Sequence, residues 1–291
     1  MLAGHDLTVF SLLKLFRGRV TMTWVLTFGE AALAALIPLF IGLAIDGLLG
    51  GSSRALWHLA SVLAALTAIG VARRLYDTRV YGTIRVELGK AQVARSAALP
   101  VSALNARLDM GRELVDFLED TLPGAVASAV QFAVSIAVLF AYAPQLALAA
   151  AAAALAMAVV YAFFHHRFYR LNGQLNQQAE RQVGVLERRT MPGALAHLTR
   201  LRRFEVQLSD AEAVLFGVVF VFLLALILFN LWLAAAVLSV SAGAVFAIVS
   251  YSWDFAEASL SVPVTLQTWS RLSEISNRLN PVRTSSGAAE D

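Results

Sequence analysis

The segment AVFAIVSYSWDFAEASLSVPVTLQTW (Ala244–Trp269) decides the fold class, because it is apolar, long enough to cross a membrane, and carries two acids near its middle. Six of its polar residues recur with an average spacing of 3.6 positions, which places them on one face of an α-helix. They are Ser250, Asp254, Glu257, Ser261, Thr265 and Thr268. An ionised carboxylate at the bilayer centre costs on the order of 3 kcal/mol, so we predict that this face lines a pathway through the membrane.

The composition is that of a membrane protein. Of the 291 residues, 58% are hydrophobic and only 15% are charged, against about 25% in soluble domains. No acidic or basic residue occurs in residues 121–164 or 213–253, and each run is about twice the ~20 residues that one spanning helix needs. These runs predict an all-α integral membrane protein.

Several functional classes are excluded or disfavoured by the residue types. The chain has no cysteine, which excludes disulfides, cysteine-ligated metals and thiol catalysis. The five histidines lack metal-ligand spacing with carboxylates, so no metal site is expected. The net charge of +3 is interpreted as membrane topology rather than nucleic-acid binding. We therefore predict no catalytic residue in this chain, and no enzyme.

Six membrane spans are predicted, at about 20–48, 56–73, 122–142, 146–164, 214–236 and 244–269. An even number places both termini on one side, and the loops on the other side then hold only Arg54 of the 23 lysines and arginines. Basic residues favour the cytoplasm, so both termini are expected inside, in a bacterial inner membrane. The predicted division is an amphipathic cytoplasmic segment at 1–16, a six-helix domain at 17–280 and a polar tail at 281–291.

The two inner connections, about 74–120 and 165–212, are long and helical in composition. Each is predicted to have a descending arm, a short transverse helix and an ascending arm. The first transverse helix is placed at Ser102–Leu108, before a turn at Asp109 and Gly111, and the second at Ala194–Phe204. These helices are candidate docking surfaces for a cytoplasmic partner, or solvated faces attracted to lipid headgroups. The candidate docking residues are Ser102, Asn105, Asp109, Gly111, His197 and Arg200.

Three stretches in this order resemble the six-helix membrane domain of ABC exporters, over about residues 10–280. They are Pro38–Asp46, the region Leu99–Asp120, and Leu238–Gly243 followed by Phe246 and Tyr251. The resemblance implies a dimer that alternates its access and is driven by an ATPase. That family normally continues into an ATPase domain, whereas this sequence has no Gly-x-x-x-x-Gly-Lys-Ser/Thr loop. ATP and Mg²⁺ are therefore expected to act only through a partner chain.

The candidate pathway residues each have two interpretations. Asp254 and Glu257 form a substrate- or proton-binding pair, or they are held by a donor from another span. Glu30 is a second acid facing the same cavity, or a hydrogen-bonded structural glutamate. Trp253 stacks on a cationic or aromatic substrate, or it packs in the bundle. Ser250 and Ser261 are the remaining candidate pathway residues.

Three functions remain open. The first is the membrane subunit of an ABC-type transporter, a homodimer or heterodimer with a separate ATPase. The second is a proton-coupled secondary transporter of peptides or small organic molecules, in which Glu30, Asp254 and Glu257 carry protons. The third is a non-transporting assembly or sensor subunit.

Overall fold

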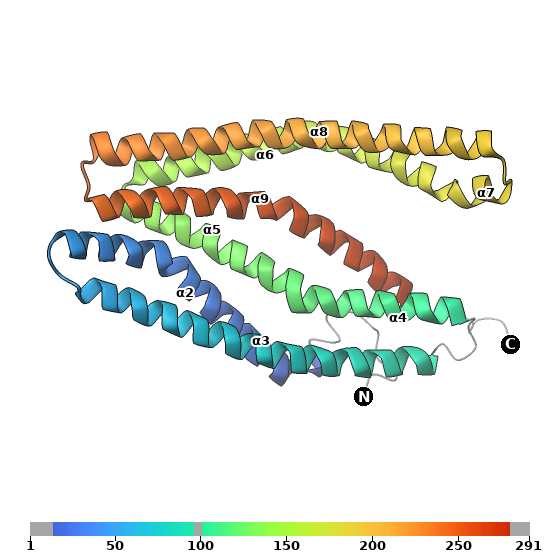
Figure 1. Cartoon of the computed structure of the whole chain (residues 1–291), viewed down its shortest axis with the longest axis horizontal. Coiled ribbons are helices and arrows are strands. Elements are labelled where there is room, and N and C mark those ends of the chain that lie inside the picture. The colour runs from blue at the N-terminus through green and yellow to red at the C-terminus, as the bar shows by residue number, and fades with distance from the viewer. Residues whose placement is uncertain (1–13, 96–100, 280–291) are drawn as a thin grey trace, which may run out of the picture. The chain divides into compact units, whose positions relative to one another are not determined.

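The computed structural model describes residues 14–95 and 101–279, and all regular structure among them is helical (Figure 1). The predicted surface segment and tail fall mostly on residues 1–13 and 280–291, which lie outside the described residues. The elements in chain order are α2 (Arg17–Leu49), α3 (Arg54–Arg95), α4 (Val101–Asp116), η1 (Phe117–Thr121), α5 (Leu122–Tyr142), α6 (Pro144–Glu180), α7 (Gln182–Glu187), α8 (Met191–Trp232), η2 (Leu233–Val237) and α9 (Ala242–Leu279).

Five helical stretches in the described residues are long and apolar enough to cross a membrane. They contain α2, α3, α5, α6 and α8, and they match the first five predicted spans. The sixth predicted span lies in α9, a helix of spanning length in which Asp254 and Glu257 lower the hydropathy. The all-helical multi-pass membrane fold predicted from composition is therefore confirmed.

The chain divides into two compact units. The first contains residues 1–138 and 240–291, and the second contains residues 139–239. In the first unit, α2 packs against both α3 and α9, and α3 packs against α4. Its apolar core lies between α2, α3, α4 and η1. The part of α3 beyond the predicted span is polar on one side but has an apolar face, and this face packs into the core. The largest fully buried side chains of this core are Tyr81, Ile84, Leu88, Leu114 and Leu118.

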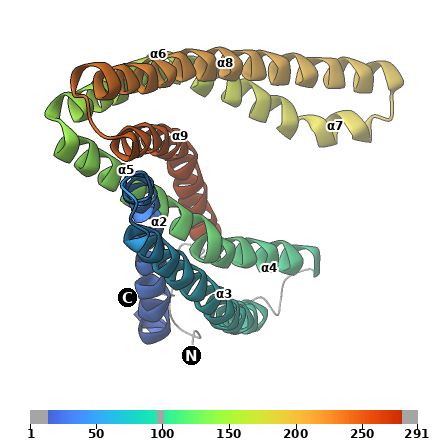
Figure 2. The same ribbon diagram turned by 60° about the vertical axis from the view of Figure 1, so that its left-hand side comes forward.

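The second unit is a long antiparallel hairpin of α6 and α8, joined through α7 (Figure 2). Ala147, Ala150 and Ala153 are buried on α6, and a row of larger residues is buried on α8. That row contains Leu215, Val219, Leu223 and Leu226. Alanine lets two helix backbones approach closely. In lipid there is little hydrophobic driving force between helices, so such close van der Waals packing is what holds spanning helices together.

The predicted turn in the first inner connection is wrong. Helix α4 runs without a break through Asp109 and Gly111 and continues through η1 into α5. Gly111 packs against the Gln92 side chain of α3, and a Cβ there would lie 2.8 Å from the Gln92 amide oxygen. The glycine therefore permits a close contact between two helices rather than a turn.

The separate transverse helix predicted at Ala194–Phe204 is also wrong, because these residues form the first turns of the continuous helix α8. The chain breaks instead just before α8, where Arg189 has a positive φ of 49°. Pro192 lies in the first turn of the helix, where a missing backbone N–H costs no hydrogen bond. The only short element of this connection in the described residues is α7.

Two stretches used for the resemblance contact each other. The Asp46 carboxylate, near the end of α2, accepts hydrogen bonds from the Ser241 hydroxyl at 2.5 Å and the Gly243 backbone N–H at 2.8 Å. A carboxylate at a helix N-terminus satisfies free N–H groups and interacts favourably with the helix dipole. Next to it, a Cβ on Gly42 would lie 2.5 Å from the Gly243 carbonyl oxygen. Asp46 thus joins the end of α2 to the start of α9.

Candidate functional site

Asp254 is half-buried on α9 and is held by an amide, not by a base. Its Oδ2 atom accepts a hydrogen bond of 2.6 Å from Nε2 of Gln131 on α5. The rings of Phe132 and Phe255 stack beside this bond with centroids 4.9 Å apart, so they fix the two helices at this level. The static donor considered from sequence therefore exists, and it is a neutral amide rather than a base.

Three more residues of the predicted polar stripe, Ser250, Glu257 and Ser261, also lie on the less buried side of α9, whereas the side chains of Thr265 and Thr268 lie outside the described residues. Glu257 is exposed, while Ser250 and Ser261 are half-buried, and the Ser261 hydroxyl donates to the Ala258 carbonyl at 2.7 Å. Trp253 is 52% exposed. The opposite side of the helix is buried, through Ala247, Ile248, Tyr251 and Phe255. The described part of α9 therefore has a more exposed polar side and a buried apolar side, and the substrate or proton role of the polar side stays a prediction.

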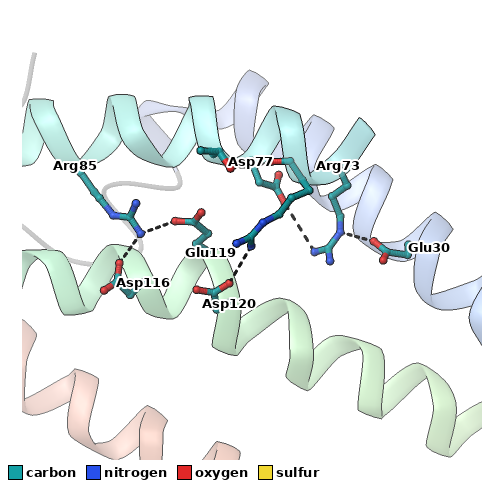
Figure 3. Close-up of polar contacts among 9 residues, drawn as sticks. Glu30, Arg73, Asp77, Arg85, Asp116, Glu119 and Asp120 are labelled. Carbon is teal, nitrogen blue, oxygen red and sulfur yellow. Dashed lines mark hydrogen bonds and ion pairs between the residues drawn. The ribbon is translucent and has the colours of Figure 1, made fainter. Parts of the chain in front are cut away.

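Glu30 lies with basic and acidic residues of α3, not with Asp254 (Figure 3). Its carboxylate pairs with Arg73, whose Nη1 atom lies 3.8 Å from Oδ2 of Asp77. Glu30, Arg73 and Asp77 line one cavity of about 260 Å³ between α2, α3 and the start of α5. Glu30 is therefore held by a charged partner at the wall of a cavity, and its role stays a prediction.

A second group of ion pairs joins α3 to α4 and η1. Nη2 of Arg85 lies 2.5 Å from Asp116 and 2.6 Å from Glu119, and Arg74 lies 3.7 Å from Asp120 (Figure 3). These contacts were not predicted from the sequence. The signal in the sequence was the group of acids just before the third span, Asp116, Glu119 and Asp120. The preceding arm carries arginines, including Arg74 and Arg85, that could pair with them.

Replacing Arg85 by methionine should lower the free energy of unfolding by about 2 kcal/mol, because Glu119, whose side chain is 7% exposed, then loses its charged partner. Thermal unfolding in detergent, followed by circular dichroism, measures the change. The matched control is Lys90→Met, which removes an exposed pair with Glu87 on the same helix and should cost at most about 0.5 kcal/mol. Equal losses in the two variants would contradict the bridging role of Arg85.

Asn105 and Asp109, two of the first set of candidate docking residues, lie one turn apart on α4 and are both exposed. The exposed Asn105 amide donates to Asp109 at 3.2 Å. Both residues, with Gly111, line a hollow of about 340 Å³ between α4 and α3. Ser102 lies in the first turn of α4. The structure therefore brings these predicted residues onto one helix, and their docking role remains a prediction.

The second set is split by the fold. Arg200 is exposed on α8, whereas His197 is buried, 4% exposed, with Nδ1 2.8 Å from Nε2 of Gln178 on α6. As placed, the His197 side chain faces the interior of the hairpin and joins α6 to α8. Arg200 alone of this pair presents its side chain to the surface.

Among the described residues, no group of three or more histidine, cysteine, aspartate or glutamate side chains is arranged to hold a metal ion. Residues 10–243 match a family model described as ABC transporter transmembrane region. A comparison with curated proteins found no match.

Proposed function

The chain belongs to the family of ABC transporter transmembrane regions, and from this premise we propose that it works as a dimer with alternating access, driven by an ATPase on a separate chain. The observation that carries the proposal is the family match over residues 10–243, which covers five helices of spanning length. The proposal places the protein in a bacterial inner membrane with both termini in the cytoplasm, as the distribution of basic residues predicts.

In the proposal, the polar face of α9 lines the transport pathway. Asp254, Glu257 and Ser250 are at least partly accessible, and Asp254 is held by the neutral amide of Gln131. A carboxyl group at bilayer depth is tolerated where it faces a water-filled cavity or a partner. One copy supplies one such face, and a second copy would enclose it.

The proposed docking surface for the ATPase is the side of α4 that carries Asn105 and Asp109. Both side chains are exposed, and the Gln92–Gly111 contact fixes α4 against α3. A helix fixed in this way transmits movement of a docked partner to α3 as a rigid element. Arg200 supplies a possible second contact from α8.

Single cysteines test the pathway cleanly, because the natural chain has none. Ser250→Cys in liposomes should react with a membrane-impermeant thiol reagent, since thiolates form only where water reaches them. Ala247→Cys, at a fully buried position of the same helix, should not react. Leu228→Cys on α8, at a position 64% exposed, controls for exposure to lipid.

We expect Ser250→Cys to react at least about tenfold faster than both controls, because a thiol in hydrocarbon stays protonated and unreactive. The reaction is followed by mass spectrometry of the intact protein. A rate equal to that of Leu228→Cys would place Ser250 in lipid and remove α9 from the pathway.

A second candidate function is favoured by the Gln131–Asp254 bond. Because no base holds Asp254 in the described residues, it could exchange protons and couple transport to a proton gradient, without ATP. This candidate is a secondary transporter of peptides or small organic molecules on the same membrane fold.

A further inference from the structure

The hairpin of α6 and α8 leaves the membrane at one level on both helices. The hydrogen bond between Gln178 and His197 shows which residues of these antiparallel helices lie opposite each other. Counted back from that pair, Phe164, the last residue of the uncharged run on α6, lies level with Ala211 on α8. The uncharged run of α8 begins two residues after Ala211. The apolar parts of the two helices therefore end together, and this level marks the membrane boundary.

Three arginines lie on one flank of the hairpin just beyond this boundary. In an antiparallel helix pair, the residues that directly precede the contact residues of each helix share a flank, because both helices have the same hand and run in opposite directions. Arg170 precedes the buried Leu171 on α6, and Arg203 precedes the half-buried Phe204 on α8. Arg167 lies one turn before Arg170 on the same flank. All three side chains are exposed, and none forms an ion pair with another described residue.

The charge on this flank is not balanced by acids. Near the boundary, the acid that shares the flank among the described residues is the exposed Asp210, so three bases and one acid give a formal charge of +2. The opposite flank carries Arg202, Glu205 and Glu212, which together give −1. A general excess of basic residues on the cytoplasmic side would not separate the two signs in this way. The positive charge is therefore a local feature of one flank.

On the membrane side of the boundary, the same flank is apolar and exposed. Phe163 on α6 is 80% exposed. Val214 and Val218 on α8, which precede the buried Leu215 and Val219, are 56% and 38% exposed. The flank thus changes from apolar to basic within about two helical turns. A phospholipid has its acyl chains and its phosphate in this order, whereas an acidic soluble protein would contact only the basic part.

We propose that this flank binds one anionic phospholipid, with the phosphate on Arg167 and Arg170 and an acyl chain along Phe163 and Val214. At 1.5 Å per residue, the two arginines lie about 5 and 9 Å beyond the boundary. The headgroup layer is about 5–8 Å thick, so Arg167 lies within it and the long side chain of Arg170 reaches back to it.

The chemistry of the two groups indicates which headgroup fits. Arginine binds phosphate through two parallel hydrogen bonds. A headgroup that also carries an ammonium group would be repelled by the charge of +2, so a headgroup with a net negative charge is favoured. The site depends neither on the energy source nor on the pathway along α9.

The test uses the purified full chain in detergent and native mass spectrometry with dioleoylphosphatidylglycerol. Dioleoylphosphatidylcholine has the same acyl chains and phosphate but adds a cation, and glycerol 3-phosphate has the phosphate without the chains. We expect saturable binding of one phosphatidylglycerol, at least about tenfold tighter than phosphatidylcholine, and no competition from glycerol 3-phosphate. Equal affinity for the two lipids, or displacement of the lipid by glycerol 3-phosphate, would overturn the proposal.

Variants locate the site. Arg167→Gln combined with Arg170→Gln should weaken phosphatidylglycerol binding by about tenfold or more, because both charged donors to the phosphate are lost. The control combines Arg188→Gln with Arg189→Gln, which removes the same charge from exposed positions beside α7, at the far end of the hairpin (Figure 2). Its affinity should be unchanged. Circular dichroism checks the helix content of both variants.

An equal loss in the two double variants, or an unchanged affinity in the first, refutes the site. Should the first double variant fail to fold, Arg170→Gln alone decides. It removes one exposed charge and should weaken phosphatidylglycerol binding by about fivefold, and unchanged affinity in this variant would likewise refute the site.

Discussion

Replacing Gly243 by alanine is expected to lower the free energy of unfolding by about 3 kcal/mol. A Cβ at this position would lie 2.7 Å from the Asp46 carboxyl group and would press on the Gly42 carbonyl oxygen. Backbone atoms cannot rotate away, so the overpacking costs about 1–3 kcal/mol. Forced separation of the helices would also weaken the 2.8 Å bond from the Gly243 N–H to Asp46, worth about 1 kcal/mol.

Thermal unfolding in mild detergent, followed by tryptophan fluorescence, measures this loss. At roughly 2–4 °C per kcal/mol, the melting temperature should fall by about 6–12 °C. Gly82→Ala is the control, because nothing lies within 4 Å of a Cβ there and alanine improves helix propensity by up to about 1 kcal/mol. If both variants melt at the wild-type temperature, the crossing of α2 and α9 is not a close contact.

This crossing shows which parts of the fold the sequence could predict. The spanning helices follow from uncharged runs and the 3.6-residue period, so α2 and α5 were found with nearly the observed bounds. The contact of Asp46 with Gly243 joins residues 197 positions apart, and nothing in either stretch specifies its partner. A local sequence pattern predicts where helices lie, whereas which helices contact each other depends on how their side chains pack.

The glycine errors have the same origin. Gly111 was interpreted as a turn because glycine is common in turns, yet it serves to admit the Gln92 side chain inside a continuous helix. A sequence does not distinguish these two uses. Pro192 is a similar case, because proline often marks the end of a helix but here lies in the first turn of α8, where it is well tolerated.

The candidate site was predicted in part. Periodicity placed Ser250, Asp254 and Glu257 on one face of α9, and the structure leaves all three at least partly accessible. The partner of Asp254, Gln131, lies 123 positions away and was not foreseen. The partner of Glu30 was not foreseen either: Arg73, at the end of an apolar run, is long enough to reach it.

Replacing Asp254 by asparagine is expected to abolish proton-driven flux, if the protein couples transport to protons. Asparagine has nearly the shape of aspartate, and its side-chain oxygen still accepts a hydrogen bond from Gln131, so the contact of α5 and α9 remains. The variant cannot exchange a proton at this position. The loss therefore reports the chemistry of the carboxyl group rather than a change in fold.

The flux is measured in proteoliposomes with an imposed pH gradient and no nucleotide, using fluorescently labelled short peptides and small organic molecules as cargo. Wild-type protein should accumulate at least one of them, and Asp254→Asn should fall to the level of protein-free liposomes. Glu87→Gln, which removes an acid from the exposed Lys90 pair, should keep wild-type flux.

The two proposed energy sources give different results in this experiment. Gradient-driven flux in the wild type that survives in Asp254→Asn would remove this carboxyl group from the proton mechanism. Absence of wild-type flux without nucleotide would instead eliminate the proton-coupled candidate and leave the ATPase-driven one. In the ATPase-driven transporter, Asp254 still lines the pathway. The reaction rate of Ser250→Cys tests this position of Asp254 separately, because a fast reaction requires water on the polar face of α9 whatever supplies the energy.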